Sequence, residues 1–551
     1  MPFIILVIVI ISASVIITVV SNINSKRRRI AALKADYGKP PVADDDIQFE
    51  SIGRYAMYIE KHNPTRQRVD RVTWNDLDMD RVFSRINSCQ TSVGEEYLYH
   101  CLHELPLDGK TLARREGLAQ FFANNPEERI AAQSLLLSMG KENHNGLTAL
   151  MFAPDISMLK NPRLYTALAL MPLLMPALMI YSIPMGVIGL VAVFAVNMMV
   201  YYRTKNRIAI EIPSIKYLIS MLKCCKGLLK MKALENQPYM DEIRRYYKAL
   251  KSLKRNMPAM TSAAGDLAGS FFEYINIMFL SDIRNYNKFM KTIKECSPEF
   301  HALYRAFGEV DMSICISSFR LSLPAYALPV FCEDNTLEFT DIYHPLIASP
   351  VVNSGAVTND SIITGSNASG KSTFIKALAI NGILAQTINT CAAKAFKARF
   401  SLIVTSMMLR DDLAAGESYF IVEIKSLKRI LDLVQKYPCT CFIDEILRGT
   451  NTVERIAASA AVLEYMHSQD ALCLAASHDI ELTRILAGKY DNYHFREHVT
   501  DDGIEFDYKL KDGPSTTRNA LKLLRFMNFA DEIVGQADKL AEGYAKDERW
   551  C

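Results

Sequence analysis

The chain has 551 residues, of which 63 are Lys or Arg and 60 are Asp or Glu, and its formal net charge is +3. A chain of this length is too long for one ordinary hydrophobic core, so two or three domains are expected. The near balance of charges excludes a general electrostatic affinity for nucleic acid, and any DNA contact would need a local basic patch.

The first 25 residues carry no charged side chain and include an apolar run from Phe3 to Val20, which Lys26–Arg29 follow at once. The run is long enough to cross a bilayer, whose apolar core is about 30 Å thick. A cleaved signal peptide carries its positive charge before the apolar run, whereas here the charge comes after it. We therefore predict a transmembrane anchor over residues 1–25, with a buried core helix as the alternative.

A second stretch without charge, residues 164–202, lies between Arg163 and Arg203. As one helix it would be nearly twice as long as the bilayer core of about 30 Å, and the turn-forming residues Ser182–Gly186 lie near its middle. We therefore predict a transmembrane helical hairpin. Basic residues flank all three spans on one side, which indicates a multi-pass protein of the inner cell membrane with its other parts in the cytoplasm.

The segments around the hairpin, residues 26–163 and 203–330, are predicted to form a helical core in two parts, because apolar residues recur at helical spacing. Their many Lys and Arg residues are interpreted as solvated helix faces, with a DNA-binding stripe as the alternative. Pro324 and Pro329 mark the transition from this helical region to a region rich in strands. From there strands and helices alternate, which predicts an α/β domain over residues 331–551.

The loop after a β-like run at residues 361–364 fits G-x-x-x-x-G-K-[ST] at every fixed position, and a helical stretch follows. Its glycines allow backbone N–H groups and a helix N-terminus to converge on phosphate oxygens. Lys371 is expected to reach the β- and γ-phosphates of ATP, and the Ser372 hydroxyl to bind Mg²⁺. The predicted nucleotide-binding residues are Gly365, Ser366, Asn367, Ala368, Ser369, Gly370, Lys371, Ser372 and Thr373.

A second strand of the predicted site, residues 439–444, is apolar and leads into two acids, as expected of a magnesium strand beside the P-loop strand. Asp444 is expected to hold Mg²⁺ through water, and Glu445 to act as general base for the attacking water. A further β-like run at residues 471–477 brings His478 to the same edge of the sheet, where we expect it to contact the γ-phosphate. A solvated surface histidine is the alternative.

Another helix is predicted before the strand at residues 439–444, and it starts after residue 418. Apolar side chains recur in it at three- and four-residue spacing, which is typical of a helix face that packs into a core. The predicted core stripe consists of Phe420, Ile424, Leu427, Leu431 and Val434.

Four motifs occur in a fixed order in this part of the chain: TGSNASGKST, DDLAAGESYFIVEI, FIDEILRGTNT and ASHDIELT. In order and spacing they resemble the ATPase domain of the MutS family of DNA mismatch-repair proteins. The resemblance covers about residues 335–545 and implies an ABC-type P-loop ATPase fold that uses ATP and Mg²⁺. A weaker likeness of residues 83–108 to the start of the family's helical core, or lever, domain extends it upstream.

The resemblance also implies composite nucleotide sites in a homodimer, with Ser418 of one subunit reaching the γ-phosphate bound by the other. Tyr419 stands where the family usually has a threonine. Asn367 matches the family's P-loop asparagine, which orients the attacking water, so the expected catalytic residues are Glu445, His478 and Asn367. The family's mismatch-reading domain has no counterpart in the first 45 residues, and the hairpin occupies the place of the DNA-gripping clamp.

Two functions therefore stay open at this stage. The first is a membrane-anchored MutS-like ATPase that binds DNA, with mismatch repair implied by the resemblance. The second is a membrane-associated ATPase that acts on a protein or membrane partner without DNA, which the balanced charge favours because DNA affinity depends on neutralising phosphates. An ABC transporter ATPase is a weaker third choice, since AAGES (residues 414–418) stands in place of an LSGGQ-type signature.

Overall fold

The structure is a computed structural model, and its description covers residues 2–42, 48–64, 66–142, 146–256, 267–366, 369–407, 419–500, 503–515 and 529–547. The chain folds as two compact units. A helical unit comprises residues 1–65, 86–100 and 113–322, and an α/β unit comprises residues 66–85, 101–112 and 323–551. Both units take discontinuous parts of the chain, so the five consecutive segments expected from the sequence stay a prediction.

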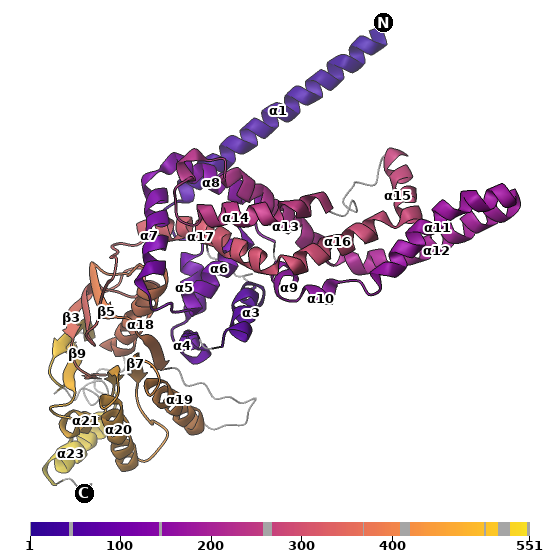
Figure 1. Ribbon diagram of the computed structural model, residues 1–551. Coiled ribbons are helices and arrows are strands. Elements are labelled where there is room, and N and C mark those ends of the chain that lie inside the picture. The colour runs from indigo at the N-terminus through magenta and orange to yellow at the C-terminus, as the bar shows by residue number, and fades with distance from the viewer. Residues whose placement is uncertain are drawn as a thin grey trace. The chain divides into compact units, whose positions relative to one another are not determined.

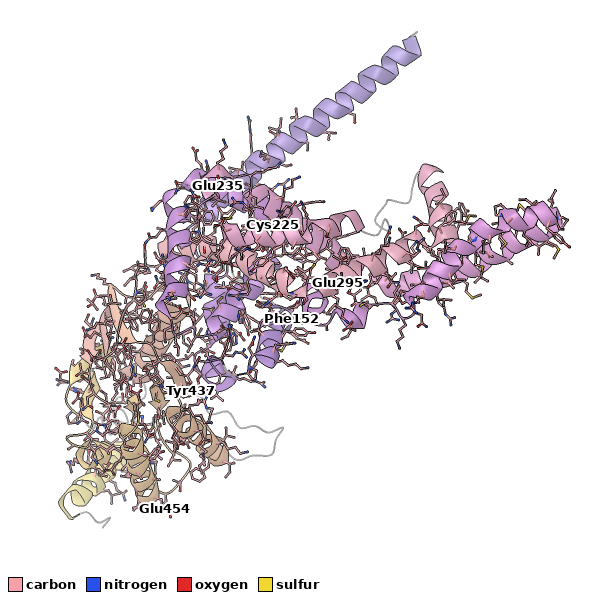
Figure 2. All side chains as sticks on the ribbon, viewed as in Figure 1. Phe152, Cys225, Glu235, Glu295, Tyr437 and Glu454 are labelled. Atoms are coloured by element: carbon pink, nitrogen blue, oxygen red, sulfur yellow. The ribbon has the colours of Figure 1, made fainter. Side chains whose placement is uncertain are left out.

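The helical unit is built around α17 (Ser297–Leu321), most of whose residues are buried. Arg115 makes a buried ion pair with Glu309 at 3.1 Å, and the Tyr97 hydroxyl donates to the same carboxylate at 2.8 Å. Phe152, which is labelled in Figure 2, stacks on Tyr58 with ring centroids 5.3 Å apart. The other helices of this unit are α1 (Pro2–Asp36), α2 (Phe49–Ile52), α3 (Arg54–His62), α6 (Ser92–His103), α7 (Gly109–Asn124), α8 (Pro126–Met139), α9 (Leu147–Phe152), α10 (Pro154–Ser157), α11 (Pro162–Tyr181), α12 (Ile183–Ala209), α13 (Ile212–Leu228), α14 (Met240–Leu250), α15 (Leu267–Phe279) and α16 (Ser281–Glu295), with short 3-10 helices at Lys232–Leu234 and Lys251–Asn256.

The predicted hairpin is formed by α11 and α12, which Ser182 joins and which lie side by side (Figure 1). A Cβ atom on Gly186 would lie 2.2 Å from Met179 Cγ, so the glycine is needed for this close approach, as at helix contacts in membranes. The buried Asn197 amide donates to the carbonyl oxygens of Leu168 at 3.2 Å and Met278 at 2.7 Å, and so ties α12 to α11 and α15.

Among the described residues, two helices are long and apolar enough to cross a membrane, and they correspond to α11 and α12. The sequence predicts about three, so the count of three is not supported. The predicted anchor at residues 1–25 forms the first part of the single helix α1, which continues through the basic residues Lys26–Arg29. Side chains of most residues up to Val20 lie outside the described set, and the anchor stays a prediction.

The α/β unit contains a six-stranded sheet with the order β10-β9-β4-β8-β7-β6, in which β10 alone is antiparallel to its neighbour. Every residue of β4, β6, β7 and β8 is buried, as expected of parallel strands covered on both faces. The predicted α/β class is thus confirmed. The strands are β4 (Ser361–Thr364), β6 (Leu402–Ser406), β7 (Cys439–Asp444), β8 (Ala471–Ala476), β9 (Asp491–Thr500) and β10 (Gly503–Asp512).

Helices α18 (Lys371–Ile388), α19 (Tyr419–Val434), α20 (Thr452–His467), α21 (Ile480–Ile485) and α23 (Asp531–Asp547) complete the α/β unit, together with a four-stranded sheet of the order β1-β5-β2-β3. This sheet consists of β1 (Val330–Cys332), β2 (Leu337–Ile342), β3 (Asn353–Val357) and β5 (Ala395–Arg399). The prediction that the magnesium strand lies beside the P-loop strand is wrong in one respect. Strand β8 pairs with both β4 and β7 and separates them, because the chain inserts its later strand between the two earlier ones.

The edge of the large sheet is covered by a segment from far upstream, which carries α4 (Arg71–Asp76) and α5 (Met79–Ile86). The Thr405 hydroxyl and the Met407 backbone N–H, both at the end of β6, donate to Asp76 Oδ2 at 2.7 Å and 2.9 Å. The Thr405 N–H donates to Thr73 Oγ1 at 3.1 Å. Residues 66–85 therefore belong to the α/β unit, although the sequence places them far from it.

Candidate functional site

The candidate site begins where β4 ends and α18 starts, and its loop depends on two glycines. Gly365 has φ +140°, and a Cβ atom there would lie 2.7 Å from the carbonyl oxygen of Phe495. Gly370 caps α18 with φ +100°. Residues with a Cβ atom rarely adopt either conformation, so the two glycines of the motif are required by the backbone. The result is the strand-loop-helix geometry that directs backbone N–H groups toward phosphate.

Lys371 is the first residue of α18 and is 1% exposed. Its ammonium group donates to the carbonyl oxygens of Gly365 at 2.5 Å and Ser366 at 2.8 Å, inside the loop. Ser369 Oγ also donates to Ser366 O at 2.7 Å. A buried ammonium surrounded by carbonyl oxygens supplies a fixed positive charge at the mouth of the loop, which is the charge that phosphate oxygens need.

Asp444 and Glu445 follow at the end of β7, at the same carboxyl edge of the sheet. Asp444 is buried, and its Oδ1 atom has no hydrogen-bond partner among the described residues. An unsatisfied buried carboxylate oxygen is costly unless a ligand completes it. Ser372, in the first turn of α18, is half-buried. One carboxylate and one hydroxyl, with phosphate oxygens, fit Mg²⁺, which protein sites hold through few side chains.

Glu445 is held at both carboxylate oxygens. His478 Nε2 lies 3.0 Å from Oε1, and the Arg448 guanidinium makes an ion pair with Oε2. His478 Nε2 also lies 3.5 Å from Lys371 Nζ, so P-loop, β7 and β8 side chains converge here. Burial alone would raise the pKa of Glu445, but the hydrogen bond with His478 and the charges of Arg448 and Lys371 hold it below its ordinary value. Glu445 is therefore ionised at neutral pH.

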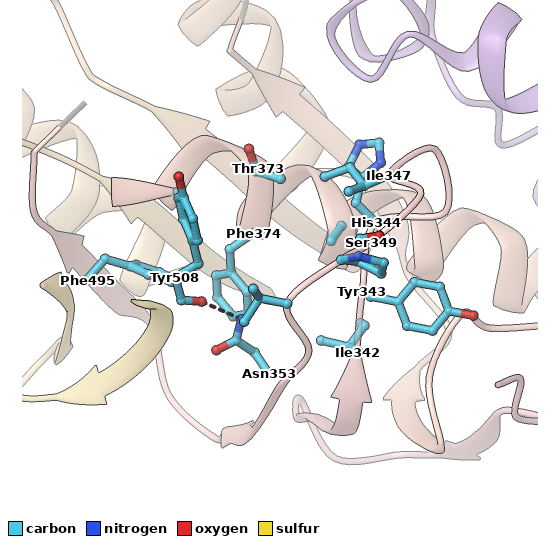
Figure 3. Close-up of a pocket in the computed structure, with 14 residues that line it drawn as sticks. Ile342, Tyr343, His344, Ile347, Ser349, Asn353, Thr373, Phe374, Phe495 and Tyr508 are labelled. Atoms are coloured by element: carbon cyan, nitrogen blue, oxygen red, sulfur yellow. Dashed lines mark hydrogen bonds between the residues drawn. The ribbon is translucent and has the colours of Figure 1, made fainter. Parts of the chain in front are cut away.

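A cavity of about 330 Å³ opens beside the P-loop helix and was not predicted from the sequence (Figure 3). Gly370 and Phe374 line it from α18, and Asn353 and Tyr508 line it from two other strands. The Asn353 amide donates to the Tyr508 carbonyl at 3.0 Å, which fixes this wall. Its lining comes from segments about 150 residues apart in sequence, so no local pattern could have revealed the cavity.

His344 is a further lining residue of the cavity. Burial, with the nearby charge of Lys376, lowers its pKa to about 4, so its imidazole is neutral at physiological pH. The side chain of Lys376 forms an ion pair with Asp78 at 3.7 Å. His344 was assigned no role from the sequence.

The structure brings together Lys371, Asp444, Glu445 and His478, as the sequence predicted for the edge of the sheet. Asn367, Ala368 and Ser418 lie outside the described residues. The roles of all predicted site residues stay predictions.

The predicted core stripe of α19 is wrong at Ile424, which is 40% exposed, whereas the neighbouring Glu423 is 1% exposed. The predicted stripe is right at Leu427 and Val434, which are buried, and the buried face of the helix also includes Glu423 and Ile430. Sequence reasoning missed Glu423 because a lone glutamate in a helix is normally assigned to the solvent side.

Comparison with known proteins agrees with this geometry. Residues 361–544 match the family model of MutS domain V. The DNA mismatch repair protein MutS of Natronomonas pharaonis is 34% identical over 191 residues, which is 34% of this chain and 22% of that protein. MutS protein homolog 4 of Homo sapiens is 33% identical over 270 residues, covering 45% of this chain and 28% of the relative. The DNA mismatch repair protein MutS of Staphylococcus saprophyticus is 28% identical over 267 residues, covering 46% and 30%. The chain thus spans less than a third of the length of each of these relatives.

Proposed function

We propose that this chain, which belongs to the MutS family, is a membrane-attached ATPase that binds ATP with Mg²⁺ and hydrolyses it to ADP and phosphate. The observation that carries the proposal is the convergence of a buried lysine, a P-loop, two acids and a histidine at one edge of a parallel sheet. Open α/β sheets bind their ligands at this edge. The match to MutS domain V over residues 361–544 supports the same assignment.

In this proposal the phosphate oxygens of ATP replace the loop carbonyls as partners of the Lys371 ammonium. Asp444 and Ser372 would hold Mg²⁺, which would supply charge neutralisation for the phosphates. Ionised Glu445 accepts the proton of the attacking water, so that an oxygen–phosphorus bond forms at the γ-phosphate while the bond to ADP breaks. His478 donates to a γ-phosphate oxygen and steadies Glu445. Asn367 orients the water.

The cavity beside Gly370 is proposed to hold the adenine base. Phe374 and Tyr508 offer aromatic surface, and the neutral imidazole of His344 offers a hydrogen bond to a ring nitrogen. Adenine carries no charge and is planar, so an apolar cavity of about 330 Å³ with few polar groups suits it. The base would then lie next to the start of α18, where the phosphates are bound.

We further propose that the ATPase acts as a homodimer with Ser418 completing the partner's site, and that the α11–α12 arm attaches it to the membrane. The arm exposes Leu173, Ile188 and Val191, and its two helices, which carry no charge between residues 164 and 202, are long and apolar enough to enter a bilayer. Water would make such exposure costly, whereas acyl chains would not. The inner membrane, with the α/β unit in the cytoplasm, is the proposed location.

The test is nucleotide binding and turnover of the purified full chain in detergent. Lys371→Ala should abolish ATP binding, because the buried charge at the loop is lost. Glu445→Gln should keep ATP binding and lower turnover by about 10²- to 10⁴-fold, the usual contribution of a general base. Asp432→Asn, on the exposed face of α19, serves as the matched control and should behave as wild type. Normal hydrolysis by Glu445→Gln would remove Glu445 as the base.

The partner of the ATPase separates two versions of the proposal. The relatives named as mismatch repair proteins favour duplex DNA. The exposed apolar arm and the net charge of only +3 favour a membrane or protein partner without DNA. Binding of the full chain to homoduplex and mismatched duplex, measured over a range of salt concentrations, decides between them. If the partner is DNA, the affinity for duplex should fall steeply as the salt concentration rises. If no duplex binds even at low salt, the membrane or protein partner is the version that stands.

A further inference from the structure

The loop that follows the magnesium strand is held by a buried carboxylate from another helix. Glu423 lies on α19, is 1% exposed, and its Oε1 accepts the backbone N–H of Arg448 at 3.2 Å. Burial raises the pKa of Glu423, while the N–H groups of Arg448, Leu447 and Gly449 act in the opposite direction by stabilising its charge. The loop is therefore tied to this carboxylate by the hydrogen bond from the Arg448 N–H to Oε1, while Oε2 is buried without a hydrogen-bond partner among the described residues.

This loop needs an external restraint. Glu445 has φ +60° and Leu447 has φ +58°, and both carry side chains for which the left-handed region is unfavourable. Such backbone persists only where the surroundings hold it in place. A carboxylate that accepts a hydrogen bond from the N–H of Arg448, the residue after Leu447, supplies a restraint of this kind.

A second contact joins the same loop to α19. A Cβ atom added to Gly449 would lie 3.0 Å from Phe420 Cβ, so the loop backbone touches the first turn of the helix. Phe420 and Glu423 are three residues apart, which places them on one face of α19. The loop therefore rests on a helix surface made of one aromatic side chain, Phe420, and one carboxyl side chain, Glu423.

We propose that Glu423 is a positioning residue that sets the orientation of Glu445 for hydrolysis, acting through the Leu447–Gly449 loop. The loop contains Arg448, whose guanidinium forms an ion pair with Glu445 Oε2. Because Glu423 binds the Arg448 backbone, a displacement of α19 moves both the Arg448 side chain that pairs with Glu445 and the strained backbone beside Glu445. The helix starts one residue after Ser418, so a ligand or partner that shifts its N-terminus changes the geometry of the base. This inference rests on Glu445 being the general base of the proposed ATPase.

The experiment compares Glu423→Ala, Glu423→Gln and Gly449→Ala in the full chain, with Asp432→Asn on the same helix as the control. ATP affinity, measured with a fluorescent nucleotide, should stay within about threefold of wild type, because none of these residues lies at the P-loop. Turnover at saturating ATP should fall by about 10- to 100-fold in Glu423→Ala and Gly449→Ala, as expected when a catalytic group is misplaced. Glu423→Gln keeps one acceptor oxygen and should recover part of the loss. Unchanged turnover in all three variants would overturn the proposal.

A double variant then tests whether Glu423 acts through Glu445. Combining Glu423→Ala with Glu445→Gln should lower turnover no further than Glu445→Gln alone, because a misplaced base and an absent one are equivalent. A further tenfold loss would show that Glu423 acts elsewhere and would overturn the inference. If Glu423→Ala does not fold, judged by its melting curve, Gly449→Ala provides the same comparison. Failure of the ATPase proposal itself is distinct, since wild type would then lack turnover before any change at Glu423.

Discussion

Replacing Gly370 with Ala tests whether the backbone of the phosphate loop is as constrained as it appears. With φ +100° the residue is in a region that costs a residue with a Cβ atom about 1–2 kcal/mol. The new Cβ atom would also lie 2.9 Å from Tyr508 Cδ1, but that ring is 42% exposed and has room to move. The backbone cost therefore dominates. Relief of the strain turns the loop N–H groups away from the phosphates. Since about 1.4 kcal/mol corresponds to a tenfold change in affinity, a cost of about 1–2 kcal/mol should lower ATP affinity by about 5- to 30-fold.

The matched control is Gly488→Ala, since Gly488 has φ +84° and no atom within 4 Å of the added Cβ. Gly488→Ala should lose about 1–2 kcal/mol of stability in the α/β unit and keep its ATP affinity, whereas Gly370→Ala should show the same backbone cost as lost ATP affinity. The assay is a titration with a fluorescent ATP analogue, together with thermal unfolding of the same samples. Gly370→Ala with wild-type affinity, or an equal loss of affinity in Gly488→Ala, would refute the reasoning.

Two further predictions concern the charge at the base and the upstream segment. Arg448→Met should raise the pKa of Glu445, because the charge of Arg448 helps to lower it. Activity needs ionised Glu445 and is lost as the pH falls through this pKa. The acid limb of the profile of kcat against pH should therefore move to higher pH. An unmoved limb would exclude Glu445 as the titrating group. Asp76→Ala removes the acceptor of the Thr405 and Met407 donors and should cost about 2–4 kcal/mol, because two buried donors lose a charged partner. Denaturant unfolding checks this, with the fluorescence of Trp74 on α4 as the local probe.

The phosphate loop could be predicted from sequence because all of its determinants are local. The preceding strand, the fixed positions of the motif and the following helix all lie within residues 361–388, and the structure shows β4, Gly365, Gly370 and α18 in that order. The apolar runs ending at Asp444 and before His478 were likewise recognisable as buried parallel strands. Each of these features depends on neighbours in the chain.

The order of the strands was not predictable in this way. Whether β8 or β7 lies next to β4 depends on which helices cover each face, and no single segment records that choice. The position of Glu423 shows a related limit. Spacing alone placed Ile424 in the core, whereas Glu423 takes the buried position beside Leu427 and Val434, since the buried partner of Glu423 is a backbone loop 25 residues away.

The upstream segment gives α19 a second attachment, which bears on how nucleotide state could leave the site. Arg429, two turns after Glu423, forms an ion pair with Asp70, the residue that caps α4. The helix α19 is thus attached at two points. Glu423 binds the Leu447–Gly449 loop, and Arg429 binds the segment of residues 66–85. Because this segment is continuous in sequence with the helical unit at both of its ends, any movement of α19 that follows hydrolysis has a covalent route into that unit. The proposed membrane-attached ATPase would need such a connection, since an attachment at α19 transmits displacement where a free surface loop would absorb it.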